Sequence, residues 1–257
     1  MLYLIGLGLS QKDISLKGLQ ALKTADKIYI ERYTLPISQE YVSFLESETQ
    51  KKIVELKRRD LEDQRKATIA DAANSTVAIL VPGDPLVATT HHIILEAARE
   101  LGIEMATYHA PSIFSVAIGE SGLDIYKFGP TTTIPFWSAK YKPTSFIDVI
   151  KRNLENNQHT LVLLDVDPVE GKTMSSGDAI ALLEKADERK GKGTITDKRK
   201  ILIICEAGTA EQEILYTNMA DTKIEKAQRR LEGKRTCLII PAELSFAEEE
   251  LVSAFKI

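Results

Sequence analysis

The sequence is poor in the residues that build disulfide frameworks and metal sites. Its 257 residues include only 2 cysteines and 4 histidines. Cys205 and Cys237 each lie inside an apolar run, so we expect both to be reduced core residues of a cytoplasmic protein. His91 and His92 are neighbours, and on a helix their side chains would diverge by about 100°. The sequence therefore predicts no disulfide and no metal site.

Long hydrophobic runs and an excess of positive charge are also missing. No segment approaches the roughly 20 apolar residues that cross a bilayer, and the N-terminus lacks the basic region of a signal peptide. The chain has 33 lysines and arginines against 37 aspartates and glutamates, a formal net charge of −4. Nucleic-acid binders normally need a basic surface. We therefore expect a globular cytoplasmic protein with neither a membrane nor a nucleic-acid partner.

Three familiar sequence motifs are absent. Gly6 and Gly8 follow the first apolar run, but Gln11 occupies the third glycine position of a dinucleotide-binding G-x-G-x-x-G motif. There is neither a Walker motif nor the G-x-S-x-G elbow of a nucleophilic serine. Glycine tolerates positive φ in a tight turn, and its missing side chain also lets a ligand approach the backbone. Both interpretations of this glycine turn stay open.

The sequence does contain a repeated alternation of short apolar runs with helical patterns, which predicts an α/β fold with a largely parallel sheet. Pro111 biases the preceding residue toward an extended conformation, and we place a boundary there, between domains at 1–110 and 111–257. The segment 190–200 is expected to be an exposed loop and the most mobile part of the second half. The predicted strands are 2–7, 27–30, 53–56, 77–81, 103–108, 131–136, 160–166, 201–205 and 237–240.

The run Pro82-Gly83-Asp84-Pro85 is the sharpest local signal. It follows a fully apolar strand, and open α/β sheets bind ligands at the carboxyl ends of their strands. Two prolines stiffen the turn, so it can present the Asp84 carboxylate in a fixed geometry. The alternative is an ordinary helix entry, with Asp84 serving the turn and Thr89 or Thr90 as the N-cap. We favour the functional interpretation.

Polar residues follow several other predicted strands. Ser112 could cap a short helix or hydrogen-bond a ligand, and both interpretations stay open. Asp165 and Asp167 end a strand of the second half, while Glu206 and the turn at 241–244 follow two more. Each is compatible with an ordinary strand-to-helix turn. Their shared placement predicts a site assembled from several loops.

Taken together, these motifs resemble the tetrapyrrole-methylase fold and, within it, the diphthine synthase family. The resemblance spans nearly the whole chain and implies two α/β domains with a cleft between them for S-adenosylmethionine. The strings PGDPLVATTH and GLDIYKFG are long enough to make a chance match implausible. The other strings that carry the resemblance are LYLIGLGL, ISLKGL, HAPSI, HTLVLLDV and EAGT.

The resemblance also implies a reaction. The enzyme would repeatedly methylate the amino group of a 3-amino-3-carboxypropyl histidine in elongation factor 2, releasing S-adenosylhomocysteine and giving diphthine. It implies a homodimer as well. Two alternatives are another methyltransferase of the same fold, acting on a tetrapyrrole or ribosomal RNA, and a non-catalytic module that binds S-adenosylmethionine. The cofactor contacts implied by the resemblance are Leu9, Asp84, Val87, Ser112, Ile113, Leu164, Ala207 and Thr236.

Methyl transfer from a sulfonium to nitrogen is an in-line displacement, and alignment supplies much of its catalysis. The incoming amine must be unprotonated when it attacks, yet the sequence names no catalytic residue. Our hypothesis for the base is either water or a carboxylate such as Asp165 or Asp167. Aromatic faces attract a quaternary ammonium product. Tyr126, Phe136 and Trp137 are candidates for that contact, although core packing is the favoured role of each.

Overall fold

The computed structural model describes residues 1–167, 172–223 and 233–256. The chain divides into two compact units, Met1–Phe114 and Ser115–Ile257. We refer to them as unit 1 and unit 2. None of the helices in the described ranges is both long enough and apolar enough to cross a membrane.

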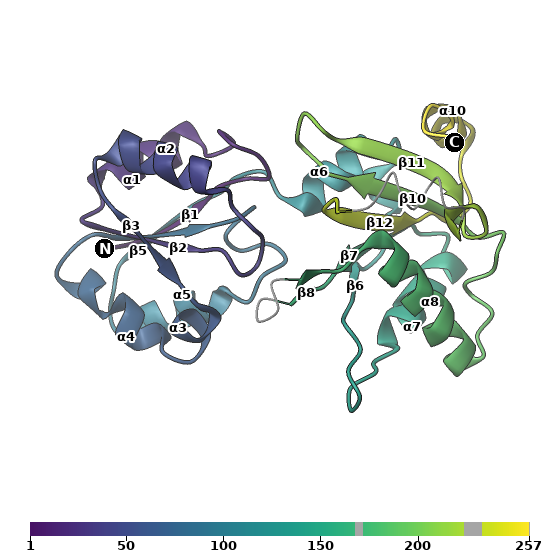
Figure 1. Ribbon diagram of the computed structural model, residues 1–257, viewed down its shortest axis with the longest axis horizontal. Helices are drawn as coiled ribbons and strands as arrows, with labels where there is room; N and C mark the ends of the chain where they lie inside the picture. Colours follow the sequence, from purple (N-terminus) through teal and green to yellow (C-terminus); the bar gives the residue numbers. More distant parts are fainter. Residues whose placement is uncertain (168–171, 224–232, 257) are drawn as a thin grey trace. The chain divides into compact units, whose positions relative to one another are not determined.

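Unit 1 is built on a five-stranded sheet in the order β3-β2-β4-β1-β5, and all of its pairings are parallel (Figure 1). All five strands predicted in this half are confirmed, although β5 begins two residues later than expected. Every residue of β4 is buried, as in a strand covered on both faces. The strands are β1 (Leu2–Gly6), β2 (Lys27–Glu31), β3 (Ile53–Leu56), β4 (Val77–Val81) and β5 (Met105–Tyr108).

Helices cover both faces of this sheet, in three layers (Figure 1). One face packs its alternate residues, such as Ile5 and Leu80, against the first two helices. The other face packs residues such as Leu4 and Ile79 against the remaining helices. The helices are α1 (Leu16–Thr24), α2 (Gln39–Thr49), α3 (Arg58–Glu62), α4 (Arg65–Ile69), η1 (Ala70–Ala73) and α5 (His92–Glu100).

Two helices of unit 1 begin in different ways. Ser15 precedes α1 and its side chain accepts a hydrogen bond from the backbone N–H of Gly18, as expected for an N-cap. At α5 the N-cap position that the alternative interpretation gave to Thr89 or Thr90 is occupied by His91, so that part of the alternative is wrong. The imidazole of His91 makes no capping bond, since its nitrogens are engaged elsewhere.

Unit 2 contains a second five-stranded sheet, in the order β11-β10-β12-β7-β6. Only β6 and β7 pair in parallel, and the other pairings are antiparallel. The expectation of a largely parallel sheet is therefore wrong for this half. The strands are β6 (Thr132–Ile134), β7 (Thr160–Leu164), β10 (Lys200–Cys205), β11 (Glu213–Asn218) and β12 (Thr236–Ile240).

Two strands of unit 2 differ from the predicted pattern. The predicted strand 160–166 is interrupted at Asp165, and Val166 belongs instead to β8 (Val166–Asp167), which pairs antiparallel with β9 (Lys172–Thr173). The sequence analysis missed β11, because its residues Glu213–Asn218 mix charged, polar and apolar types without clear alternation. β11 pairs along its whole length with β10.

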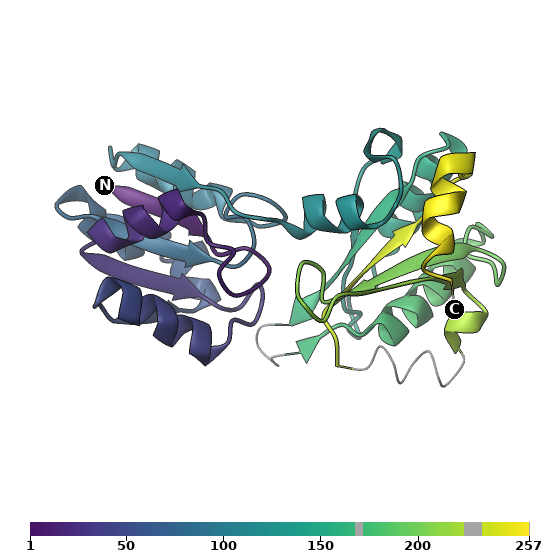
Figure 2. The same cartoon turned by 90° about the horizontal axis from the view of Figure 1, so that it is seen from above.

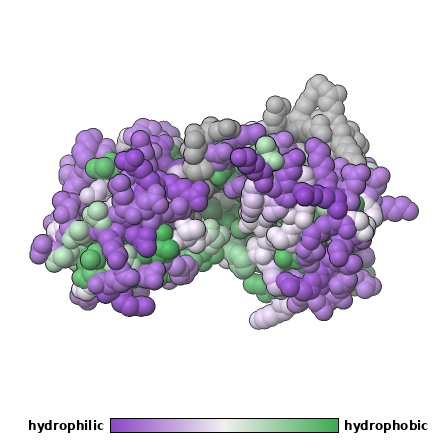
Figure 3. All heavy atoms as spheres, turned by 90° about the horizontal axis from the view of Figure 1, so that it is seen from below, coloured by the Kyte–Doolittle hydropathy of each residue, from purple (hydrophilic) through white to green (hydrophobic). Residues whose placement is uncertain are grey.

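Helices α7 and α8 pack on one face of the second sheet, and α10 lies on the opposite side of it (Figures 1 and 2). Phe146 and Ile150 of α7 and Leu183 of α8 are buried in a core with the inner residues of the strands. The outer surfaces of the helices seen from below are largely hydrophilic (Figure 3). The elements are α6 (Ile113–Glu120), η2 (Ile125–Lys127), α7 (Ser145–Glu155), α8 (Ser176–Lys190), η3 (Asp221–Lys223) and α10 (Phe246–Ser253).

The predicted loop at 190–200 joins α8 to β10. It is not exposed throughout, because Thr194 is buried. The carboxylate of Asp187 accepts hydrogen bonds from the backbone N–H groups of Thr194 and Ile195, at 3.1 and 3.0 Å. These bonds fasten the middle of the loop to the end of α8.

Candidate functional site in the loops at the strand ends

The carboxyl ends of β1, β4 and β5 lie side by side in unit 1, because β1 pairs with both of the other strands. The loops that follow them are in close contact. Gly8 and Gly83 exchange backbone hydrogen bonds of 2.8 and 3.1 Å, each with positive φ. A side chain at Gly6 would bring a Cβ within 2.9 Å of both Ala110 and Pro85. The glycines therefore let three loops pack against one another, which supports the turn interpretation.

Asp84 connects these three loops. Its side chain is buried, and its Oδ1 accepts a hydrogen bond of 3.0 Å from the backbone N–H of Leu86. Its Oδ2 lies 2.8 Å from Nδ1 of His109 and 3.4 Å from the backbone nitrogen of Ala110. Asp84 thus serves the turn, as one predicted alternative stated, and also holds the loop after β5. A buried carboxylate with several donors is the usual way in which such a charge is stabilised.

The other predicted residues of unit 1 lie on the same three loops. Leu9 is half-buried, and its N–H donates to the Asp13 carboxylate at 3.1 Å. Val87 is 37% exposed, beyond the Asp84 turn. Ser112 is buried and accepts a hydrogen bond of 3.2 Å from the N–H of Phe114, so it caps the first turn of α6, which Ile113 begins. Unit 1 therefore brings its five predicted residues to the side of its sheet at which β1, β4 and β5 have their carboxyl ends.

The three predicted residues of unit 2 also share one edge of a sheet. Leu164 is the last residue of β7, Ala207 follows β10, and Thr236 is the first residue of β12. The antiparallel register pairs Cys205 with Thr236, and their Sγ and Oγ1 atoms lie 3.6 Å apart. β12 also pairs antiparallel with β7, and extending that register by two residues places Leu164 opposite Thr236. Antiparallel pairing thus gathers the three positions from two strand ends and one strand start.

Beside Ala207, the structure shows an ion pair that the sequence analysis did not predict. Glu206 has a positive φ of 47°. Its carboxylate accepts a hydrogen bond of 2.7 Å from Nε of Arg235. The backbone N–H of Arg235 also donates to this carboxylate, at 2.7 Å. The two residues join the turn after β10 to the start of β12. Because they are 29 residues apart, no local pattern could have indicated the pair.

Asp165 has contacts that give it a structural role. Its Oδ1 accepts a hydrogen bond from the N–H of Val166, and its Oδ2 accepts one from the N–H of Phe136, both at 2.9 Å.

The three aromatic candidates differ in their surroundings. Trp137 donates a hydrogen bond from Nε1 to the Pro143 carbonyl and packs on the core, as Phe136 does, so core packing is confirmed for both residues. The core-packing role favoured for Tyr126 is wrong, because this residue is 92% exposed.

Two buried histidines also lie outside the predicted site. His91 is 1% exposed, with Nδ1 2.9 Å from the Thr89 hydroxyl and Nε2 3.3 Å from that of Tyr33. Burial lowers the pKa of His91 to about 4. His159 is fully buried, and its ring contacts Glu248 in unit 2. Both residues are core histidines.

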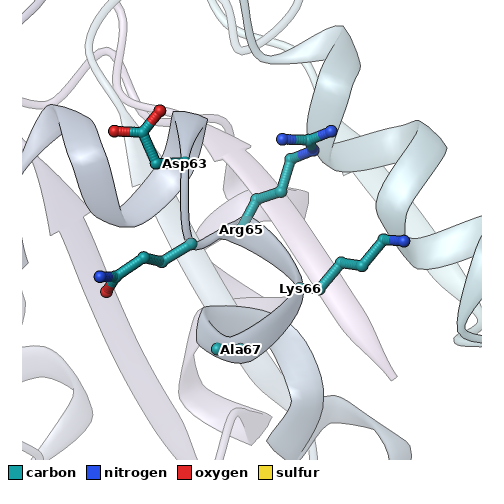
Figure 4. A pocket seen from close by; sticks show the side chains of 5 residues that line it. Asp63, Arg65, Lys66 and Ala67 are labelled. Carbon is teal, nitrogen blue, oxygen red and sulfur yellow. The ribbon is translucent and has the colours of Figure 1, made fainter.

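A hollow at the junction of α3 and α4 is not a convincing ligand site. It is lined by residues 63–67, and its labelled side chains point in different directions rather than toward a common centre (Figure 4). Among the described residues, no group of three or more histidine, cysteine or acidic side chains could hold a metal ion. Both cysteines are buried and free.

The fold and these loops can now be compared with known proteins. The family model of the tetrapyrrole (corrin/porphyrin) methylases matches residues 1–223. The chain belongs to the tetrapyrrole methylase family. The resemblance seen in the sequence, and the α/β fold expected from it, are thereby confirmed.

Individual members of the tetrapyrrole methylase family match over nearly their whole length. The diphthine synthase of Methanothermobacter thermautotrophicus is 39% identical over 97% of this chain and 93% of its own. The diphthine synthase of Methanocaldococcus jannaschii is 38% identical over 97% of this chain and 96% of its own. A crystal structure titled as that of diphthine synthase superposes with a TM-score of 0.85, at 33% identity over 99% of this chain and 95% of the other.

The sequence analysis missed one residue of the strand-end loops of unit 1. His109 contacts the predicted residue Asp84 and lies three residues before Ser112 in the sequence, with its side chain 66% exposed. The string HAPSI contains it, but a histidine next to a proline-containing turn carries no specific signal by itself. Its contact with Asp84 joins residues 25 positions apart and is visible only in the folded unit.

Proposed function

We propose that this protein is a diphthine synthase. It uses S-adenosylmethionine to methylate, repeatedly, the amino group of the 3-amino-3-carboxypropyl histidine of elongation factor 2, and it releases S-adenosylhomocysteine. The observation that carries this proposal is the full-length similarity to curated diphthine synthases, at 39% identity over 97% of the chain. A match of this extent includes both units and all the loops described above.

The residues present fit S-adenosylmethionine. The cofactor has an amino acid portion, a sulfonium and an adenine, and a site for it needs backbone donors and acceptors beside apolar walls. The packed loops of unit 1 supply backbone groups, the apolar side chains of Leu9, Val87 and Ile113, and the Ser112 hydroxyl. When bound, the cofactor supplies an activated methyl group. The residues proposed to hold it are Leu9, Asp84, Val87, Ser112 and Ile113 of unit 1, and Leu164, Ala207 and Thr236 of unit 2.

Further parts of the proposal follow from membership of this group of enzymes. We propose that the protein acts in the cytoplasm as a homodimer, with elongation factor 2 as its macromolecular partner. We also retain the proposed domains 1–110 and 111–257. Their boundary lies in the loop between β5 and α6, a few residues before the junction of the two compact units.

The decisive experiment is methyl transfer from radiolabelled S-adenosylmethionine. The acceptor is elongation factor 2 that carries the 3-amino-3-carboxypropyl histidine, and the unmodified factor is the control. Label on the modified factor alone supports the proposal, and mass spectrometry of that factor counts the methyl groups. Cofactor binding without transfer to either factor would instead favour another acceptor, a tetrapyrrole or ribosomal RNA, or a non-catalytic binding module.

The cofactor site has its own test. Val87→Asp places a charge in the proposed apolar wall, and we expect it to weaken S-adenosylmethionine binding at least about tenfold, measured by calorimetry. Val54→Asp is the matched control, because Val54 is a 53% exposed valine on β3 of the same unit. Equal binding by both variants would contradict the placement of the cofactor beside Val87.

A further inference from the structure

His109 combines an exposed imidazole with a buried carboxylate. Its side chain is 66% exposed, whereas that of Asp84 is 6% exposed. Nδ1 of His109 lies 2.8 Å from Oδ2 of Asp84. The other carboxylate oxygen is held by the N–H of Leu86. The carboxylate is therefore fixed in the packed loops, and the imidazole that it holds extends from them toward solvent.

The chemistry of this pair determines where the imidazole can accept a proton. An ionised carboxylate only accepts hydrogen bonds, so Nδ1 of His109 must carry the hydrogen that lies between them. In the neutral ring, the free lone pair is then on Nε2. A base whose second nitrogen is held by a carboxylate is the arrangement by which enzymes orient a proton acceptor.

We propose that His109 is the proton acceptor for the amine that is methylated, and that Asp84 is its positioning residue. This inference rests on the proposed function, because it needs an amine substrate. It also agrees with the position of His109, three residues before Ser112 and on the loop that follows β5, among the proposed cofactor contacts of unit 1.

An N–H bond of the substrate ammonium breaks, and its proton goes to Nε2 of His109. The nitrogen lone pair that is released attacks the methyl carbon of S-adenosylmethionine. The carbon–sulfur bond breaks with its electron pair going to sulfur, which leaves S-adenosylhomocysteine. The imidazolium then returns its proton to water, and each further methyl transfer to the same nitrogen requires another such deprotonation.

Other candidate bases fit this role less well. Both oxygens of Asp165 accept backbone N–H groups. His91 and His159 are 1% and 0% exposed, and each ring has both nitrogens within hydrogen-bond distance of a partner. His92 is exposed, but no contact with a carboxylate is recorded for it in the described part of the chain.

The test uses His109→Asn, because the asparagine amide can still donate to Asp84 while the accepting nitrogen is lost. At pH 7 and saturating cofactor we expect kcat to fall about 100-fold or more, the range typical of a lost acid–base group. S-adenosylmethionine affinity should stay within about twofold of wild type. His92→Asn is the matched control and should keep wild-type kcat. His109→Gln provides a second variant in case the first folds poorly.

The pH dependence separates a proton acceptor from a merely structural residue. The rate deficit of His109→Asn should shrink as pH rises from 7 to 10, because a growing fraction of the amine is then unprotonated without help. Asp84 is the charged group that faces His109, and Asp84→Asn should lower kcat in the same pH-dependent way. Its amide donor would move the hydrogen of His109 to Nε2.

Three outcomes overturn the inference in distinguishable ways. Both His109 variants as fast as wild type would exclude His109 while leaving the proposed function intact. A deficit that is constant from pH 7 to 10 would make His109 a structural residue. A wild-type enzyme that binds the cofactor but methylates no modified elongation factor 2 would overturn both the function and the role of His109.

Discussion

Each unit of this protein holds one histidine 2.8 Å from a carboxylate, yet the two pairs have opposite surroundings. In unit 1 the imidazole of His109 is 66% exposed, and in unit 2 that of His159 is 0% exposed. The distance between the partners is therefore uninformative about role. What differs is the second nitrogen of the ring and whether anything inside the protein already occupies it.

In unit 2 every polar atom of the pair is occupied. Nδ1 of His159 accepts the N–H of Ala242 at 3.0 Å, so its Nε2 donates to Glu248. Glu248 also accepts the Lys127 ammonium at 2.7 Å and the N–H of Ser245 at 2.8 Å. Burial lowers the pKa of His159, although Glu248 acts in the opposite direction. This network fastens η2 and the residue that precedes β7 to α10, and its role is structural.

The pKa of Glu248 shows how strongly the network favours its charged form. Burial acts to raise the pKa, but the hydrogen bond from Lys127 and the other donors hold it well below its usual range. A carboxylate surrounded by donors in this way contributes stability that is present above its ordinary pKa and lost as the pH falls.

A third pair of a histidine and a carboxylate lies in unit 1, and the two groups are farther apart. Nε2 of His91 is 4.0 Å from Oε1 of Glu31, and both side chains are buried. Burial raises the pKa of Glu31 to about 7, although the backbone N–H groups of Tyr33 and Thr34 and the Thr34 hydroxyl oppose that rise. Both groups of this approach therefore favour their neutral forms.

The largest effect that we expect comes from breaking the buried pair of unit 2. Glu248→Ala would leave the His159 N–H without its acceptor and the Lys127 ammonium without its carboxylate, and we expect it to lower the free energy of unfolding by about 3–5 kcal/mol. Urea denaturation measures this loss. Glu249→Ala, at an exposed position next along α10, is the control and should change it by less than about 0.5 kcal/mol. A similar loss in both variants would contradict the structural role of the network.

The second effect depends on pH and concerns Glu31→Gln. In the folded state Glu31 keeps its proton up to about pH 7, whereas in the unfolded chain it loses the proton near 4.5. The folded state therefore binds more protons, and the wild-type contribution of Glu31 to stability falls as pH rises through this window. Relative to wild type, the variant should gain about 3 kcal/mol between pH 4.5 and 8.

Denaturation at several pH values checks this gain. Glu96→Gln, an exposed glutamate of α5 in the same unit, is the control and should show no comparable change with pH. A difference between Glu31→Gln and wild type that stays constant with pH would show that the fold does not raise the pKa of Glu31.

The third prediction compares two lysines whose side chains are both 23% exposed. Lys127 pairs with the buried Glu248, and Lys190 pairs with Asp148, which is 50% exposed. Lys127→Met should cost about 2 kcal/mol of stability, the value of a hydrogen bond to a charged group. Lys190→Met should cost less than about 1 kcal/mol, as expected for a surface ion pair. An equal loss of stability in the two variants would show that burial of the carboxylate partner does not strengthen the ion pair.

The smallest effect is expected at the exposed pair. His109→Asn should change the free energy of unfolding by less than about 0.5 kcal/mol, because an exposed imidazole is replaced and the bond to Asp84 can be kept. Thermal denaturation measures this directly. A loss above about 2 kcal/mol would give His109 the same structural role as His159 and would remove the difference between the two units.

Much of the architecture could be predicted from local patterns. The apolar runs located nine strands, and the Pro-Gly-Asp-Pro turn could be predicted because it depends on neighbouring residues. Antiparallel pairing in unit 2 was not predictable, since strands buried on both faces have the same apolar pattern in either direction. β11 escaped because its mixed residues show no clear period.

The sequence by itself determined the family, most of the strands and the loops in which the predicted cofactor contacts lie. Only the tertiary structure decided what each titratable group does there. All four histidines look alike in the sequence, but two are buried with both ring nitrogens engaged, and only His109 is exposed and held by a buried carboxylate. That difference arises from contacts between residues 25 and 89 positions apart, which form only when the strands have paired.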